Sequence, residues 1–231
     1  MERDERRVVT DYRKEFIREL DAACGRYERM RVFSDACAFM AMALEQGVNL
    51  FNRKRHDEVE KCYLDMIGKY SKDEQAHFPK MLGIVVTALE TTRDSFLGPV
   101  LEAIGAAAVR NGQFLTPWSV AKVMADVNIG DVPVEPGKIV TVDDPACGAG
   151  VTLIAQGEAM LQHGYRQSDI LLTGGDIDGR ACDITYIELT LLGYAGIVRH
   201  EDALTMKKFS PDRYTLGYFI HGMPMRRRAA A

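Results

Sequence analysis

The chain has 231 residues, of which 47% are hydrophobic and 27% are charged, an ordinary balance for a folded globular protein. This composition excludes an intrinsically disordered, collagen-like or low-complexity chain. Lys and Arg number 29 and Asp and Glu 33, so the formal net charge is −4, which is not the strongly basic balance of a protein that coats nucleic acid.

The first hundred residues show helical periodicity and no strand pattern. Residues 11–30 are dense in charge and predict a polar helix, whereas residues 32–51 predict a helix with one buried face. The buried face of this second helix carries Phe33, Cys37, Met40, Leu44, Val48 and Phe51. A third helix is expected over residues 56–70, where apolar side chains keep the same spacing.

The helical pattern continues through a capping signal to about residue 110. Residues 71–74 read Ser-Lys-Asp-Glu, a capping-box sequence that predicts the start of a helix running to about Thr92. Asp94 or Ser95 could cap one more helix, which would extend to about Arg110. We therefore expect residues 1–110 to form an all-helical N-terminal domain without chemistry of its own.

After residue 110 the pattern changes to alternating strands and helices. The expected strands are residues 138–143, 169–176, 197–200 and 216–221, and the expected helices are residues 151–163 and 180–192. Strands that alternate with helices are typical of a parallel sheet with crossover connections. Residues 111–231 are therefore predicted to form a doubly wound, Rossmann-like α/β domain.

The loop between the first expected strand and its helix is the most informative segment. It reads Asp144-Pro145-Ala146-Cys147-Gly148-Ala149-Gly150. Its two glycines permit close backbone approach, and the free N–H groups of the following helix face the sheet edge where such folds bind ligands. An ordinary strand-to-helix turn remains the alternative, because many such turns contain two glycines.

An acidic residue at the end of the second expected strand strengthens the prediction of a binding site. In doubly wound nucleotide-binding folds, an acid at this place accepts hydrogen bonds from ribose hydroxyls. Asp176 holds this position, and Asp178 could take the same role. The alternative is that both carboxylates only shape the turn before Gly179 and cap the next helix.

Four segments together resemble the DNA adenine-N6 methyltransferases, in particular the methylation subunit of type I restriction–modification systems. The segments are Gly112-Gln113-Phe114-Leu115-Thr116-Pro117, Asp144 to Gly150, Gly175-Asp176-Ile177-Asp178 and His200-Glu201-Asp202-Ala203-Leu204. They occur in the family's order. The resemblance implies a Rossmann-like domain that binds S-adenosylmethionine. In the first segment, Thr116 and Pro117 also suit the N-cap and the first position of a helix.

The resemblance assigns roles to the residues of this pocket. Asp144 would lie near the ammonium group of the cofactor, Asp176 would bind its ribose, and Asp202 would bind its adenine amino group. An acidic loop suits a cationic ligand end better than a pyrophosphate, which favours S-adenosylmethionine over NAD. The remaining implied contacts are Phe114, Thr116, Pro117, Pro145, Ala146, Gly148, Gly150, Ile177 and Ala203.

The resemblance breaks down at the family's catalytic motif, Asn-Pro-Pro-Phe, which follows the fourth strand. With residues 216–221 as that strand, the motif falls on Gly222-Met223-Pro224-Met225. This segment has neither a side-chain acceptor for the target amino group nor an aromatic ring to stack on the base. No intact catalytic residue is predicted, and we expect a truncated domain. The arginines at 226–228 are expected to be solvated, with phosphate binding as the alternative.

The leading hypothesis is an S-adenosylmethionine-binding protein of the adenine-N6 DNA methyltransferase family, which would methylate adenine N6 in DNA if it is active. The alternative is a catalytically inactive binding or regulatory subunit of a restriction–modification or mobile-element system. An unrelated Rossmann oxidoreductase is the third hypothesis. The expected partners are DNA and a specificity subunit or another subunit of such a system.

The cysteines, the histidines and the hydropathy of the chain indicate which covalent links, metal sites and cell compartment to expect. The five cysteines are odd in number and form no C-x-x-C pair, and the five histidines lack metal-ligand spacing, so neither a disulfide framework nor a metal site is predicted. The charged N-terminus lacks an apolar signal core, and no run of about 20 apolar residues predicts a membrane span. We expect a cytoplasmic protein with reduced thiols.

Overall fold

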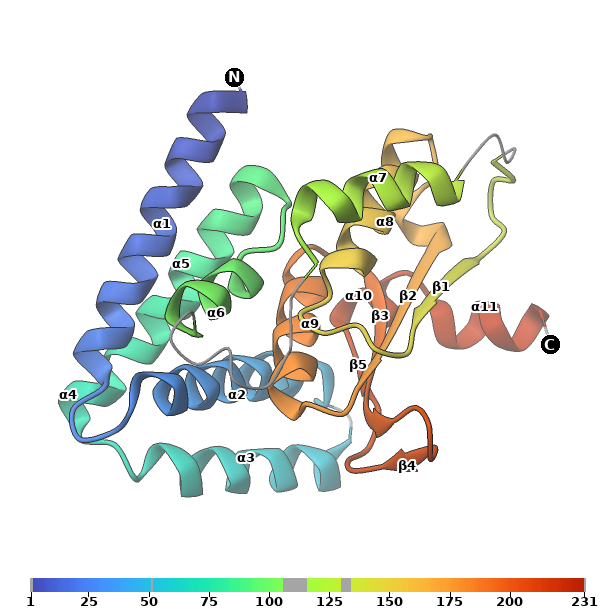
Figure 1. Cartoon of the computed structure of the whole chain (residues 1–231). Coiled ribbons are helices and arrows are strands. Elements are labelled where there is room, and N and C mark those ends of the chain that lie inside the picture. The colour runs from blue at the N-terminus through green and yellow to red at the C-terminus, as the bar shows by residue number, and fades with distance from the viewer. Residues whose placement is uncertain (1, 51, 106–115, 130–133, 231) are drawn as a thin grey trace. The chain divides into compact units, whose positions relative to one another are not determined.

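A computed structural model describes residues 2–50, 52–105, 116–129 and 134–230, with side chains placed between residues 11 and 227 of those ranges. The chain divides into two compact units, Met1–Gln113 and Phe114–Ala231. Helices make up the described part of the first unit, whereas the second contains the sheet (Figure 1). In the described part of the chain, no helix is long and apolar enough to cross a membrane.

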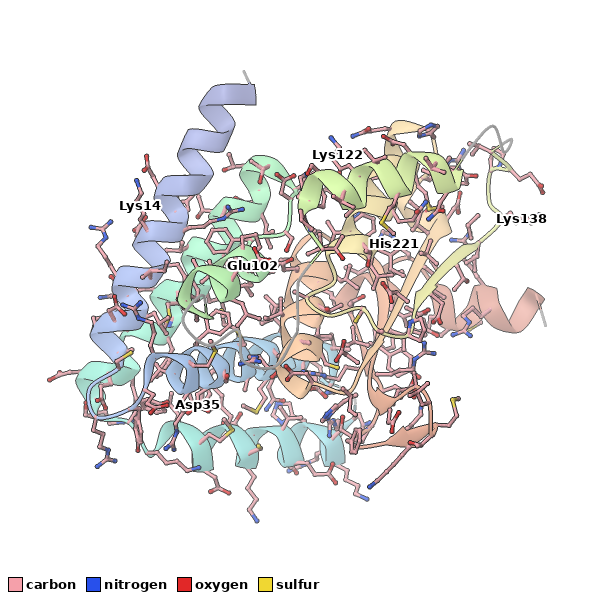
Figure 2. All side chains as sticks on the ribbon, in the orientation of Figure 1. Lys14, Asp35, Glu102, Lys122, Lys138 and His221 are labelled. Atoms are coloured by element: carbon pink, nitrogen blue, oxygen red, sulfur yellow. The ribbon has the colours of Figure 1, made fainter. Side chains whose placement is uncertain are left out.

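The first unit is built around a core of aromatic and aliphatic side chains. Its helices are α1 (Glu2–Ala23), α2 (Arg29–Val48), α3 (Arg53–Ile67), α4 (Lys72–Gln75), α5 (His77–Thr92) and α6 (Leu97–Gly105). The α1 helix packs on α5, and α2 packs on both α3 and α5. The Phe16 ring makes edge-to-face contacts with Phe33 and Phe96, and all three side chains are buried. On the other side of α2, the hydroxyl of Tyr70 donates to Asp35 (labelled in Figure 2) at 2.6 Å.

Most helix predictions for this unit are confirmed, although several bounds differ, among them those of α1, which begins at Glu2, and of α3, which spans Arg53–Ile67. The first predicted helix is interrupted, because α1 ends at Ala23 and a turn through Gly25 precedes α2. Gly25 has a φ of 45°, a conformation that side chains rarely adopt, and a Cβ atom there would displace the Glu74 carboxylate from the capping box. The capping box is present, but Ala76 separates the short α4 from α5. The predicted buried face is confirmed at Phe33, Cys37 and Met40, while Leu44 and Val48 are half-buried and Phe51 lies outside the described residues.

The second unit contains a sheet whose three long strands are parallel. Its elements are α7 (Trp118–Ile129), β1 (Val140–Asp144), α8 (Val151–Gln162), a 3-10 turn (Gln167–Asp169), β2 (Ile170–Asp176), α9 (Gly179–Leu191), β3 (Ala195–Asp202), β4 (Lys207–Lys208), β5 (Arg213–Tyr214), α10 (Leu216–Ile220) and α11 (Met223–Ala230). The strand β2 lies between β1 and β3, and the short β4 and β5 pair with β3 in antiparallel fashion. The parallel strands are joined by the helices α8 and α9, as predicted for a Rossmann-like domain.

The two faces of this sheet are covered by different helices. Gly174 of β2 faces Leu153 of α8, and Gly196 of β3 faces Leu189 of α9, so α8 and α9 share one face. The opposite face carries a cluster of Leu171, Ala195, Ile197, Tyr218 and Met223. The last two residues of this cluster come from α10 and α11. The helix α7 packs on α8, and Lys122 lies on its exposed side (Figure 2).

The prediction of a fourth strand at residues 216–221 is wrong. Leu216–Ile220 forms the helix α10, whose N-cap Thr215 accepts a hydrogen bond from the Tyr218 amide. The run Leu-Gly-Tyr-Phe-Ile is short and apolar, and such a run does not distinguish a strand from a helix. The buried Thr215 favours the helix, because its hydroxyl also donates to the Tyr194 carbonyl and fixes the start of α10.

The prediction that the arginines after residue 225 are solvated is wrong for Arg226. Its guanidinium lies 2.6 Å from the carboxylate of Asp169, which is buried, and donates to the backbone carbonyls of Gly137 and Ser168. These contacts fasten α11 to the segments just before β1 and β2, at the amino ends of the strands. Arg227, in contrast, is exposed.

Candidate functional site

The loop after β1 crosses the carboxyl end of the sheet and leads directly into α8. The Cys147 amide donates to the Gly175 carbonyl at 2.9 Å, and the Gly150 amide donates to the Cys147 carbonyl at 2.9 Å. Gly148 and Gly150 have φ values of 53° and 76°, a backbone conformation that favours glycine. The second glycine is the N-cap of α8, so the loop curls around the N-terminus of this helix. This is the geometry predicted from the two glycines.

Asp144 at the start of the loop is held in place from two sides. One carboxylate oxygen accepts a hydrogen bond from the Ala146 amide at 3.1 Å, and the other accepts from the Thr152 hydroxyl at 2.6 Å. The first contact tightens the loop, and the second joins it to the first turn of α8. The carboxylate therefore has a fixed orientation at the mouth of the loop.

Asp176 at the end of β2 reaches the same loop. One of its carboxylate oxygens accepts from the Gly148 amide at 2.8 Å, and the other accepts from the Asp178 amide at 2.8 Å. Asp178 has a different task, because it caps α9 through the Arg180 amide and pairs with the Arg180 guanidinium. Of the two acids that the sequence offered, Asp176 is the one that contacts the glycine loop, while Asp178 is a helix cap.

A small cavity lies over the loop, with a volume of about 110 Å³. Its lining consists of Thr116, Asp144, Ala146, Cys147, Gly148, Ala149, Val151 and Thr152. Four of the sequence-predicted residues therefore meet in this lining, although Thr116 is distant in sequence from the other three. Thr116 comes from the segment before α7. That helix begins at Trp118, one residue later than predicted, and the Pro117 carbonyl accepts from the Val120 and Ala121 amides.

The other predicted site residues surround the loop or lie apart from the cavity. Pro145 and Gly150 belong to the loop itself, whereas Pro117 is exposed and Phe114 lies outside the described residues. The Ile177 side chain is 59% exposed, and its carbonyl oxygen lies 3.2 Å from Nε2 of His200. Asp202 and Ala203 are half-buried at the end of β3.

Asp202 is engaged with its own turn rather than with the loop. Its carboxylate accepts hydrogen bonds from the Leu204 amide at 2.9 Å and from the Thr205 hydroxyl at 2.7 Å. The bond from the Thr205 hydroxyl, helped by that from Leu204, lowers the pKa of this carboxyl below its usual value. Asp202 is therefore an ionised hydrogen-bond acceptor at the carboxyl end of β3.

Cys147 is poorly suited to act as a nucleophile. Its side chain is 6% exposed, and burial raises the pKa of the thiol far above its usual value. Burial also raises the pKa of Cys182 to about 12. Thiolates are the reactive form of cysteine, so covalent chemistry at either sulfur is disfavoured. Within the described residues, no three His, Cys, Asp or Glu side chains are grouped as a metal site would require.

Sequence reasoning missed two hydroxyls that support the loop. Thr152 binds Asp144, and Thr185 of α9 donates to the Gly148 carbonyl at 3.0 Å. Thr152 stands in the first turn after the loop, where a nearby hydroxyl is a weak but usable signal. Thr185 gave no local signal, because it comes from another helix and only the fold brings it to the loop.

A polar cluster on the other face of the sheet was also missed. Arg199 of β3 pairs with Asp143 of β1 at 2.5 Å and with the buried Glu201 at 3.0 Å. Thr173 of β2 donates to the same Asp143 carboxylate. These residues lie near the carboxyl ends of the strands, on the face opposite α8 and α9.

The position of the degenerate motif at Gly222, Met223, Pro224 and Met225 loses its basis. It was inferred from a strand at residues 216–221, and the structure has a helix there. Met223 is fully buried against Leu171 and Ala195, which lie near the amino ends of β2 and β3. This segment is therefore at the opposite end of the strands from the glycine loop.

The loop, the acid at the end of β2 and the crossover helices define the class of the second unit. It is a Rossmann-like α/β domain whose glycine loop crosses the carboxyl end of its parallel strands. Residues 100–222, which are 123 of the 231 residues, match the family described as N-6 DNA Methylase. The chain belongs to this family.

One curated relative matches more than half of the chain. It is the methylase subunit of the type I restriction enzyme MjaIX from Methanocaldococcus jannaschii, with 32% identity over 129 residues. The match covers 56% of this chain and 21% of the relative. The chain therefore spans about a fifth of the length of that relative.

Two solved structures are similar at low sequence identity. One is the methyltransferase subunit of a type I restriction–modification system from Streptococcus thermophilus, with 12% identity and a TM-score of 0.42 over 80% of this chain and 56% of that chain. The other is described as a class I S-adenosylmethionine-dependent methyltransferase from Listeria monocytogenes, with 15% identity and a TM-score of 0.44 over 93% of this chain and 70% of that chain. The family assignment itself rests on the sequence match.

Proposed function

We propose that the second unit binds S-adenosylmethionine at the loop after β1. The observation that carries the proposal is the contact between the Asp176 carboxylate and the Gly148 amide, which joins the glycine loop to the acid at the end of β2. In this proposal Asp144 faces the ammonium group of the ligand, Asp176 accepts from its ribose hydroxyls, and Asp202 accepts from its adenine amino group. The remaining contacts are Phe114, Thr116, Pro117, Pro145, Ala146, Gly148, Gly150, Ile177 and Ala203.

The charge of the described site supports S-adenosylmethionine over a dinucleotide. Asp144 is the charged residue in the described lining of the cavity, and Asp176 lies directly behind the loop. Two carboxylates at this place favour a cationic ligand and disfavour a pyrophosphate. Each carboxylate has more acceptor positions than its present hydrogen bonds use, so both can bind a ligand without losing their places. When bound, S-adenosylmethionine would supply the methyl group for transfer.

We further propose that the reaction served by this site is methylation of adenine N6 in DNA. Membership of the N-6 DNA Methylase family supports this substrate, and the type I methylase relative supports DNA and other restriction–modification subunits as partners. The place of action in this proposal is the cytoplasm, a reducing compartment in which thiols stay free.

A second candidate is a binding or regulatory subunit that holds the cofactor or DNA without methylating it. The observation that favours it is that residues 1–231 contain no Asn-Pro-Pro-Phe motif. A methyl-transfer assay with labelled S-adenosylmethionine and mixed-sequence DNA separates the two candidates. N6-methyladenine in the product supports the enzyme, and its absence together with cofactor binding supports the second candidate.

The binding proposal is tested by calorimetry with S-adenosylhomocysteine. Asp176→Ala is expected to weaken binding by about 1–3 kcal/mol, because buried ribose hydroxyls would lose a charged acceptor. Asp178→Ala is a matched control, since it removes an acid two residues away that caps α9 and does not contact the loop. The control should cost about 1 kcal/mol of stability and leave affinity nearly unchanged. A wild-type protein that binds neither S-adenosylmethionine nor S-adenosylhomocysteine at millimolar concentration would refute the site.

A further inference from the structure

Thr185 makes an unusual set of contacts for a residue in the middle of a helix. It belongs to α9, is fully buried, and its hydroxyl donates to the Gly148 carbonyl at 3.0 Å. The same oxygen lies 3.7 Å from the Cys147 sulfur. A buried Thr hydroxyl more often satisfies a carbonyl of its own helix. Here the hydroxyl donates to a carbonyl of the loop after β1 and not to a carbonyl of α9.

The residue held by this hydroxyl is bound at both its polar groups. The Gly148 amide donates to Asp176 at 2.8 Å, and the Gly148 carbonyl accepts from Thr185. These two partners come from β2 and α9, so the loop is fixed by elements outside itself. Because a glycine with a φ of 53° has many alternative conformations, two bonds from rigid elements select one of them.

Thr185 also fixes the next glycine by its shape. A Cβ atom built on Gly150 would lie 2.9 Å from the Thr185 hydroxyl oxygen and 3.0 Å from its methyl carbon. Gly150 is the N-cap of α8, so Thr185 packs against the point where the loop becomes a helix. One side chain therefore controls the loop through a hydrogen bond at Gly148 and through close packing at Gly150.

We propose that Thr185 is the positioning residue of the loop after β1. It does not touch the ligand in this proposal. It sets the distance between the loop and Asp176, the two parts that would bind the amino-acid and ribose ends of S-adenosylmethionine. The inference rests on the proposed function for its ligand, but its structural part, the fixing of Gly148, does not.

The test compares Thr185→Val with Thr185→Ser in the full chain. Valine keeps the size and branching of threonine and removes the hydroxyl, whereas serine keeps the hydroxyl and removes the methyl group. Hydrogen exchange of the Gly148 amide is measured first, without ligand. We expect Thr185→Val to speed exchange of the Gly148 amide by roughly 2- to 10-fold, the range for the loss of one hydrogen bond. Thr185→Ser, which keeps the hydroxyl, should exchange as slowly as the wild type.

A matched control is Thr173→Val on the opposite face of the sheet. Thr173 is also buried, and its hydroxyl lies 3.2 Å from the Val142 carbonyl and contacts the Asp143 carboxylate as well. Thr173→Val should therefore lose at least as much stability as Thr185→Val, without a change in Gly148 exchange beyond that of other loop amides. Equal exchange at Gly148 in Thr185→Val and in the wild type would overturn the inference, whatever the ligand.

Affinity for S-adenosylhomocysteine gives the second measurement. Thr185→Val should raise its Kd by roughly 2- to 10-fold, with recovery in Thr185→Ser and no change in Thr173→Val. An unchanged Kd in Thr185→Val would overturn the positioning role. A wild-type protein that does not bind the compound would instead refute the proposed function, and the exchange measurement would still decide whether Thr185 fixes the loop.

Discussion

At the scale of single residues, the acids of the site were easier to predict than the hydroxyls that hold them. Asp144 and Asp176 follow strands that hydrophobic pattern alone located, and the ends of parallel strands share one edge of the sheet. Thr152 and Thr185 were not predicted, because hydroxyl groups carry no periodic signal. The hydrogen bonds of Asp202 to Leu204 and Thr205 were not predicted either, because the presence of an acid does not show that it closes its own turn.

The buried thiols give a prediction at the same scale. Cys62 is exposed, whereas Cys147 and Cys182 are buried with raised pKa values. Iodoacetamide at pH 8 should therefore modify Cys62 in the native protein, and should modify Cys147 and Cys182 only after unfolding.

Peptide mass spectrometry with and without denaturant measures the modification. The urea-unfolded protein is the control, because all five thiols are then accessible. Modification of Cys147 in the native protein as fast as that of Cys62 would show that the loop after β1 opens readily and that the site described above is not its stable form.

At the scale of elements, the strands and helices flanking the glycine loop were predicted closely, and α10 was not. The strands β1, β2 and β3 are rich in β-branched and apolar residues and are bounded by turn residues. The α10 segment is equally apolar, but Thr215 caps it and its Phe219 and Ile220 side chains are exposed. The hydrogen bond from the Thr215 hydroxyl to the Tyr194 carbonyl fixes this segment as a helix and not a strand, and Tyr194 is distant in sequence.

The attachment of α11 is expected to depend on pH. Burial opposes the ionisation of Asp169, but hydrogen bonds from the Gly137 amide and from Arg226 outweigh it and lower the pKa of this carboxyl. A lowered pKa in the folded state stabilises the fold above the unfolded pKa of about 4, and this stability is lost as the pH falls through the folded value. Asp169→Asn should therefore cost about 1–3 kcal/mol at pH 7, and the cost should shrink below about pH 4.

Denaturant unfolding of both proteins at pH 7 and at pH 3 measures this difference. Asp212→Asn serves as a control, because its partner Lys208 is half exposed and a surface ion pair contributes about 0–1 kcal/mol. An Asp169→Asn penalty that is equally large at both pH values would mean that the charge of Asp169 is not what holds α11.

At the scale of the whole molecule, the sequence predicted an all-helical part followed by an α/β part because the periodicity changes once. The structure has helices before residue 106 and the sheet after residue 139 within its described ranges. The boundary at residue 110 lies outside those ranges and stays a prediction. The sheet topology was harder to predict, since β4 and β5, which each pair with β3 in antiparallel fashion, are two residues long and show no strand pattern.

The helical unit is expected to fold by itself. Its core of Phe16, Phe33 and Phe96 is made by contacts within the unit. A polypeptide of residues 1–110 should give a helical circular dichroism spectrum and a cooperative thermal transition.

The same measurement on a Phe33→Ala variant provides the control, because truncating a buried Phe costs about 3–5 kcal/mol and should abolish the transition of a small unit. A random-coil spectrum for the wild-type polypeptide would mean that this unit needs the sheet, or a partner, in order to fold.

The fastening of α11 has a practical consequence for work with the protein. Arg226 holds this helix at the amino ends of β1 and β2, and the glycine loop crosses their carboxyl ends. A fluorophore or surface tether attached at the exposed position of Arg227 would therefore stand at the far rim of the second unit. Immobilisation through that point should leave the loop facing the solution, whereas attachment at Lys122 on α7 would place the tether on the helix that follows Thr116.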